Sequence, residues 1–357
     1  MKKIMLGALM LAASMAAMAQ GDAHWLQTTY DFGAFREDGD KAQATFMLVN
    51  DSPDTIAIVS ASATCGCTVP YFDDSAIAPG DTARVRVVYN PEGRPGRFEK
   101  QVYVRTSATH ERQKLTIKGV VIGNDKTVGH YYPVDAGKLK LRNGLAMLGR
   151  VPAGHSKTEF LTGYNQSADT IRPVFANVPD YLSVRCSPSA VGPGDMTTIE
   201  FYFNASACGQ WGMVSDSIQI SANDGEEMHW LPFVAIIEED FSGLSDKQRA
   251  DAPALALPSD RVELAPVPLH STTPVAHKLK VTNTGKDPLI IRRAYSQDPA
   301  VTVKAPAEKI KGGKSAEIIV ELDPSSQPEG LINTKLVIIS NDPKVPTRTV
   351  RIVGMRQ

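Results

Sequence analysis

Four cysteines carry the most distinctive chemistry of this 357-residue sequence: Cys65, Cys67, Cys186 and Cys208. In an exported chain, which the N-terminal signal-peptide pattern predicts, an even number of cysteines is typical of complete disulfide pairing. Cys186 and Cys208 flank one predicted turn and one predicted strand, and a bridge between them would contribute roughly 3 kcal/mol through chain entropy. We therefore expect a Cys186–Cys208 disulfide.

The Cys65-Gly66-Cys67 segment allows several kinds of chemistry. In an extended strand the two Cα atoms would lie roughly 6.5–6.8 Å apart, at the upper limit for a disulfide, although a bend at Gly66 would bring them closer. Such a bridge would be a local structural staple or, if strained and easily reduced, would exchange with other thiols. Two thiolates would instead hold a soft metal such as Cu(I). These alternatives stay open, together with a pair of buried thiols.

The other polar residues form no catalytic pattern. The seven histidines lack the close spacing of metal ligands, and Glu226-Glu227-Met228-His229 follows a predicted hairpin turn instead of lying on a metalloprotease helix. The sequence has neither a Gly-x-Ser-x-Gly elbow nor a phosphate-binding glycine loop. We predict no enzyme activity, no cofactor and, apart from the weak candidates Cys65 and Cys67, no metal site.

The N-terminus has the pattern of a cleaved signal peptide over residues 1–19. Lys2 and Lys3 precede an apolar run, residues 4–18, that leads into Ala17-Met18-Ala19. This run is shorter than the roughly 18–20 residues that a spanning helix needs, and no later segment resembles a span. Cleavage after Ala19 would release a periplasmic or secreted protein.

The charge balance argues against a nucleic-acid partner. The chain has 38 lysines and arginines against 39 aspartates and glutamates. Basic residues form no stripe interleaved with aromatic residues, which is the pattern that phosphate backbones require.

Short alternating segments predict a fold made almost entirely of β-strands. In residues 83–89, Val85, Val87 and Tyr89 fall on one face while Arg84 and Arg86 fall on the other. Turn-forming clusters rich in Asn, Asp, Gly and Pro separate such runs. Seven short strands in about 95 residues are typical of an immunoglobulin-like sandwich.

This pattern occurs three times along the chain. Ala78-Pro79-Gly80-Asp81 and Gly192-Pro193-Gly194-Asp195 lie 114 residues apart, and Leu322-Asp323-Pro324 repeats Tyr89-Asn90-Pro91. We predict sandwiches at residues 25–123, 131–238 and 257–357. A short polar connector, residues 123–127, follows the first sandwich. The linker after the second, residues 239–256, would hold one or two helical turns or be a plain flexible tether, and we favour partial helix.

The first repeat resembles a known family on a specific set of motifs. These are Asp31-Phe32-Gly33, Phe46, Asn50, Thr64-Cys65-Gly66-Cys67-Thr68-Val69-Pro70, Ile77-Ala78-Pro79-Gly80-Asp81 and Asn90-Pro91-x-Gly93. They are similar to the bacterial Cys-Gly-Cys-Thr domain family of unknown function (the DUF1573 type), related to Hydin-type (ASH/MSP-like) domains. The later repeats lack Cys-Gly-Cys and resemble only the wider group. The resemblance implies a seven-stranded sandwich in exported proteins, a bias towards adhesion or assembly, and no known reaction.

We interpret the chain as an exported, non-enzymatic binding or scaffolding protein of the bacterial cell envelope. It would engage another envelope protein through sandwich edges or inter-domain grooves. One alternative is a thiol-redox or soft-metal-handling protein centred on Cys65 and Cys67. A second is a carbohydrate-binding module, for which the sequence reveals no aromatic platform.

Overall fold

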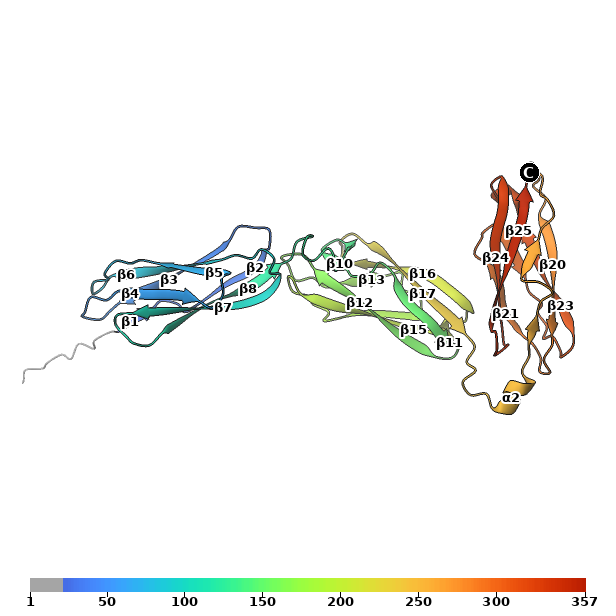
Figure 1. The fold of residues 1–357 in the computed structure, drawn as a ribbon, viewed down its shortest axis with the longest axis horizontal. Coiled ribbons are helices and arrows are strands. Elements are labelled where there is room, and N and C mark those ends of the chain that lie inside the picture. The colour runs from blue at the N-terminus through green and yellow to red at the C-terminus, as the bar shows by residue number, and fades with distance from the viewer. Residues whose placement is uncertain (1–21) are drawn as a thin grey trace, which may run out of the picture. The chain divides into compact units, whose positions relative to one another are not determined.

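The computed structural model describes residues 22–357, so the predicted signal peptide lies outside the described residues. Strands make up almost all of the regular structure (Figure 1). The chain forms two compact units: the first runs to residue 130 and includes residues 166–170 and 192–195, and the second contains the rest. No helix within residues 22–357 is both long enough and apolar enough to cross a bilayer.

The first unit contains a sandwich of two four-stranded sheets, with strand orders β1-β3-β6-β5 and β2-β8-β7-β4. Its strands are β1 (Ala23–Trp25), β2 (Thr29–Arg36), β3 (Ala42–Asn50), β4 (Ile58–Ala63), β5 (Thr68–Phe72), β6 (Thr82–Tyr89), β7 (Gly96–Thr106) and β8 (Gln113–Ile122). The alternation in β6 is confirmed, because Val85, Val87 and Tyr89 are buried in the core while Arg84 and Arg86 are not.

The second unit contains four sheets around two further hydrophobic cores. The elements around the first of these cores are β9 (Val134–Ala136), β10 (Leu139–Leu141), β11 (Ala146–Pro152), β12 (Ser156–Asn165), β13 (Val174–Ala176), β14 (Leu182–Ser187), β15 (Met196–Asn204), α1 (Ala205–Cys208), β16 (Gly212–Ser221) and β17 (His229–Glu238). Their sheet orders are β14-β15-β12-β10-β9 and β11-β17-β16-β13.

The elements around the other core of this unit are α2 (Asp246–Asp251), β18 (Leu255–Ala256), β19 (Arg261–Glu263), β20 (Val275–Asn283), β21 (Ile291–Ser296), β22 (Val301–Lys304), β23 (Ser315–Leu322), the 3₁₀ turn η1 (Pro324–Ser326), β24 (Gly330–Ser340) and β25 (Thr347–Arg356). The sheet orders are β18-β20-β23-β22 and β19-β25-β24-β21. The predicted all-β, immunoglobulin-like architecture is confirmed. The predicted seven strands per sandwich are too few: within residues 22–357 the three sandwiches have eight, nine and eight, because the opening segment of each is divided into separate strands in both sheets.

The expected helical turn in the second linker is α2. Ser245 caps this helix: its Oγ accepts from the backbone N–H of Gln248 at 3.4 Å, and Gln248 Oε1 accepts from the backbone N–H of Ser245 at 2.9 Å. This reciprocal capping box satisfies two helix-end donors, which explains why so short a polar segment is helical.

A buried asparagine ends the same strand of each sandwich: Asn50 in β3, Asn165 in β12 and Asn283 in β20, each 0% exposed. Asn50 Nδ2 donates to the backbone oxygens of Asp54 and Ile77, both at 2.9 Å. Asn283 repeats this arrangement with Asp287 and Ile310, and Asn165 Nδ2 donates to Val191 O. Ile77 O, Val191 O and Ile310 O also accept backbone N–H groups, from Ile56, Ile171 and Leu289, so each asparagine adds a second donor to such a carbonyl and satisfies its own buried amide.

Candidate functional site

The Cys65-Gly66-Cys67 segment forms a disulfide between β4 and β5, with the two Cα atoms 5.4 Å apart. This distance is shorter than an extended strand allows, because the segment turns instead of continuing β4. Two backbone hydrogen bonds hold the turn: Thr68 N donates to Cys65 O at 3.2 Å, and Asn90 N donates to Cys67 O at 2.9 Å. Among the open alternatives, the structure therefore contains the bridged form.

The bridged form does not provide a metal site at Cys65 and Cys67. Soft metals bind thiolates, and neither sulfur is a thiolate while the bridge is intact. Within the described residues, no group of three or more His, Cys, Asp or Glu side chains is arranged to hold a metal ion. The segment Glu226–His229 leads into strand β17, and Glu226 pairs with Lys138, so it does not have the helical geometry of a metalloprotease.

An open pocket of about 480 Å³ lies beside the disulfide in the first unit. Its lining residues are Cys65, Gly66, Cys67, Tyr89, Arg94, Pro95, Arg97, Phe98 and Lys100. The partly buried ring of Phe98 forms an apolar wall of the pocket, and it stacks on the buried ring of Tyr89 with centroids 4.0 Å apart. Three lining side chains are cationic and none is acidic, which makes the pocket suitable for an anionic ligand.

The predicted Cys186–Cys208 bridge is wrong, because both residues are free thiols. Cys186 lies opposite Ile199 in the β14–β15 pair, whereas Cys208 ends α1, which begins only after Asn204. The stretch of strand from Ile199 to Asn204 spans about 16 Å. One turn of helix cannot bring Cys208 back to within the roughly 7 Å that a disulfide requires. The sequence separation was compatible with a bridge, but the strand register was not.

Burial keeps the Cys186 thiol protonated. Desolvation raises its pKa to about 11, and the hydrogen bond with Thr197 lowers the pKa by a smaller amount. Desolvation also raises the pKa of Cys208. Because the thiolate is the reactive form, both thiols are poor nucleophiles at neutral pH.

We expect alkylation of Cys186 by iodoacetamide at pH 8 to be about 100-fold slower in the folded chain than in urea, because its pKa rises from 9.0 to about 11. The folded-chain rate should increase about tenfold per pH unit up to about pH 11. Mass spectrometry of a Cys208→Ser background would measure this rate at Cys186 alone. Equal alkylation rates for the folded and unfolded chains would contradict the raised pKa of Cys186.

Most edge strands of the sandwiches are protected against pairing with another chain. Strands β1, β9, β13, β18 and β19 have at most three residues, β5 contains Pro70, and β2, β4, β11 and β21 have register shifts. Short length, proline and bulges all limit edge pairing. The longest regular edge strand in residues 22–357 is β14, whose six residues pair with β15 without a shift.

Alternate backbone groups of β14 point away from β15. Asn204 N donates to Tyr181 O, so Tyr181 and Asn204 form a hydrogen-bonded pair. By alternation Ser183 and Arg185 also bond to β15, while the backbone groups of Val184 and Cys186 face the free edge. The side chains of Val184 and Cys186 pack on the core but are only partly buried.

The exposed aromatics bear on the carbohydrate alternative. Phe160 and Tyr202 are 57% and 45% exposed. Phe160 pairs with Glu200 on the neighbouring strand, so Tyr202 is its diagonal neighbour on the same face. The sequence did not show this juxtaposition because it depends on the register of β12 and β15.

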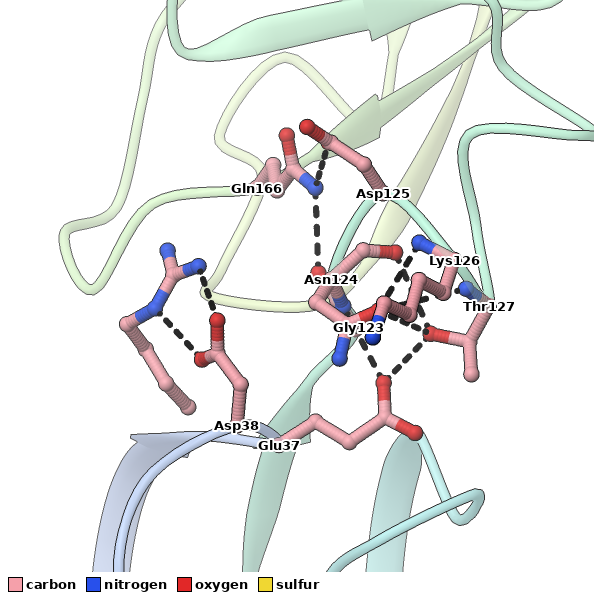
Figure 2. Close-up of polar contacts among 9 residues, drawn as sticks. Glu37, Asp38, Gly123, Asn124, Asp125, Lys126, Thr127 and Gln166 are labelled. Carbon is pink, nitrogen blue, oxygen red and sulfur yellow. Dashed lines mark hydrogen bonds and ion pairs between the residues drawn. The ribbon is translucent and has the colours of Figure 1, made fainter.

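Glu37 is a buried residue of the first unit that the sequence analysis did not identify. It follows β2 and is 3% exposed. Its carboxylate accepts from the backbone N–H groups of Gly93 at 2.7 Å and Asn124 at 3.1 Å, and from the hydroxyl of Thr127. Figure 2 shows this carboxylate facing the connector, residues 123–127. The connector is therefore fixed to the end of β2 and to the turn after β6.

Other hydrogen bonds stabilise the same connector (Figure 2). Asn124 Oδ1 accepts from the backbone N–H groups of Lys126 at 2.9 Å and Thr127 at 3.3 Å. Gln166 Nε2 donates to Gly123 O at 3.1 Å and to Asp125 Oδ1 at 3.0 Å. Residues 123–127, whose polar composition predicted a simple connector, therefore form an ordered turn.

These sheets and cores define an immunoglobulin-like β-sandwich protein. The chain belongs to the protein family of unknown function DUF1573, which matches residues 23–121 and 259–355. The third sandwich is thus a member of the family itself, and our expectation that it resembled only the wider group was too narrow. The family match does not depend on Cys-Gly-Cys, which the third sandwich lacks. The relation to Hydin-type domains stays a prediction.

No curated protein matches the sequence significantly. Among solved structures, a protein of unknown function from Porphyromonas gingivalis W83 is 16% identical, with a TM-score of 0.46 over 61% of this chain and 100% of that chain. The endo-fucoidan hydrolase MfFcnA4 from glycoside hydrolase family 107 is 14% identical, with a TM-score of 0.29 over 95% of this chain and 44% of that chain. Titin domains I67–I69 are 10% identical, with a TM-score of 0.28 over 95% and 100%. These similarities support no function.

Proposed function

We propose that this chain is an exported, non-enzymatic binding protein that accepts an extended segment of another envelope protein as an additional strand beside β14. The observation that supports it best is the free edge of β14, the longest regular edge strand in the described part of the chain. Strand addition obtains affinity from backbone hydrogen bonds and needs no special side-chain chemistry. The signal-peptide pattern of residues 1–19 supports export.

The side chains at this edge also favour an added strand. Val184 and Cys186 face the core and are incompletely covered, as are Phe175, Val178 and Tyr181 from the preceding segment. Apolar side chains of an incoming strand would bury this surface and contribute about 25 cal/mol per Å² of apolar area removed from water. The outward-facing Ser183, Arg185 and Ser187 would remain in solvent.

A proline at position 184 tests this proposal selectively. The Val184 N–H faces the free edge, so Val184→Pro removes a donor needed by the added strand but no hydrogen bond to β15. We expect binding to weaken at least about fivefold, because a carbonyl of the partner loses its donor at a cost of about 1–3 kcal/mol. Val184→Ala is the matched control, since it removes the side chain and keeps the N–H.

The experiment uses the three full-length forms as baits in an envelope extract and then measures amide exchange in the purified complex. A partner retained by Val184→Ala and lost by Val184→Pro, with slower exchange at residues 184 and 186, would support strand addition. The amides of residues 183 and 185 should change little because they already bond to β15. Equal retention by both variants, or unchanged exchange at residues 184 and 186, would overturn the proposal.

A further inference from the structure

The disulfide of the first sandwich is open to attack from solvent. Gly66 is exposed, and a methyl group added at this residue would meet no atom within 4 Å. Cys65 and Cys67 are themselves only partly buried, unlike the enclosed core behind them. A thiol can therefore approach the bridge over Gly66, which is the access that disulfide exchange requires.

The pocket beside the bridge carries excess positive charge. Arg97 Nη2 bonds to Asp195 Oδ2 at 2.8 Å, so its charge is partly compensated. Arg94 Nη1 donates to the carbonyl oxygens of Asn90 and Glu92, which are uncharged. Within residues 22–357 neither Arg94 nor Lys100 forms an ion pair. Their charges are therefore available to attract an anion and to stabilise a nearby thiolate.

A hydroxyl group contacts both sulfurs of the bridge. Thr68 Oγ1 lies 3.9 Å from Cys65 Sγ and 3.7 Å from Cys67 Sγ. Thr68 is buried at 3% exposure, so solvent does not compete strongly for this hydroxyl. Whichever cysteine leaves as a thiolate can accept a hydrogen bond from Thr68, which favours the charged form.

We propose that this pocket is a thiol–disulfide exchange site for a small thiol that carries an anionic group. In the first step the thiolate RS⁻ attacks one bridge sulfur, an R–S–S–Cys bond forms, the Cys65–Cys67 bond breaks, and the other cysteine leaves as a thiolate. A second RS⁻ attacks the sulfur of R in the mixed disulfide, so RSSR and the second cysteine thiolate are released. Two thiols are oxidised by two electrons in total, and the Cys65–Cys67 pair is reduced. This activity is independent of binding at β14.

The pocket itself determines the class of thiol. Its volume of about 480 Å³ suits a small molecule, and the ring of Phe98, which stacks on the buried Tyr89, provides an apolar wall. Arg94 and Lys100 favour an anionic substituent over a neutral or cationic one.

The test compares reduction of the oxidised full-length chain by 2-mercaptoethanesulfonate, 2-mercaptoethanol and cysteamine, which are anionic, neutral and cationic. Mass spectrometry after alkylation follows residues 42–84, a tryptic peptide in which Cys65 and Cys67 are the only cysteines. Each rate is divided by the rate for the same thiol with the urea-unfolded chain, which removes differences in intrinsic thiol reactivity. We expect the normalised rate of the anionic thiol to exceed that of the cationic thiol on the order of tenfold at low salt.

Charge reversal identifies the origin of this preference. Arg94→Glu with Lys100→Glu should remove the preference, as should 1 M salt, where the Debye length falls to about 3 Å. Lys114→Glu is the control for Lys100→Glu, since Lys114 is an exposed residue of β8 outside the pocket lining. If the double variant does not fold, single Lys100→Glu and the salt series replace it. An unreactive bridge, equal normalised rates, or a preference insensitive to both charge reversal and salt would overturn the proposal.

Discussion

Replacing Asn50 with aspartate is expected to destabilise the first sandwich by about 3–5 kcal/mol at neutral pH. The Asn50 amide nitrogen donates to the carbonyl oxygens of Asp54 and Ile77. A carboxylate oxygen at the same place would face those two oxygens at 0% exposure, and the other hydrogen-bond partner of this side chain, Ser52, carries no charge. Lower pH should restore part of the stability, because the protonated acid is neutral and can donate one hydrogen bond.

Unfolding of the full chain in increasing urea would measure this loss of stability, with proteolytic cleavage of the first sandwich at each urea concentration as the readout. Asp51→Asn is the matched control: Asp51 is exposed and bonds to His24 at 3.0 Å, so its replacement should change stability by less than about 0.5 kcal/mol. A stable Asn50→Asp protein at pH 7 would contradict the expected cost of a buried carboxylate beside these two carbonyl oxygens.

Glu37→Gln should destabilise the first unit by about 3 kcal/mol, since one buried acceptor becomes an amide that faces donor groups. The first part to loosen should be the connector, residues 123–127, because two of its groups donate to this carboxylate. Trypsin cleavage after Lys126 would therefore accelerate, and exchange of the Gly93 and Asn124 amides would rise.

Asp38→Asn provides the comparison for Glu37→Gln. Asp38 pairs with Arg36 at the surface, and exposed ion pairs of this kind contribute about 0–1 kcal/mol. Cleavage after Lys126 at the wild-type rate in Glu37→Gln would argue that other contacts, such as those of Asn124 and Gln166, are sufficient to hold the connector.

The fold could be predicted because strand alternation is a local property. The side chains of β6 show which face is buried without reference to any other strand. The cysteine pairing could not be predicted in the same way, since it depends on which residue of β15 lies opposite Cys186. The free edge of β14 could not be predicted for the same reason, because it is recognisable only when the order of strands in the sheet is known.

The polar residues of the interior were hidden by their neighbours in the sequence. Glu37 precedes Asp38, Gly39 and Asp40, a composition typical of a solvated loop. Asn50 begins a cluster that predicts a turn, and it does begin one, but its side chain also bonds to Ile77, 27 residues away. Asparagine recurs at this position in all three repeats, as Asn50, Asn165 and Asn283, but only the fold shows which carbonyl each side chain bonds to.

Parallel pairing near the two ends of a sandwich determines how that sandwich would respond to tension. In the first sandwich β2 lies near the N-terminal end, β8 closes the fold, and the two strands are parallel. A force pulling the two ends of this sandwich apart would slide β2 along β8 and load all the hydrogen bonds of the pair together. An antiparallel pair at the same place would open one bond after another under a smaller load. The parallel pairs β11–β17 and β19–β25 give the other two sandwiches the same shear geometry.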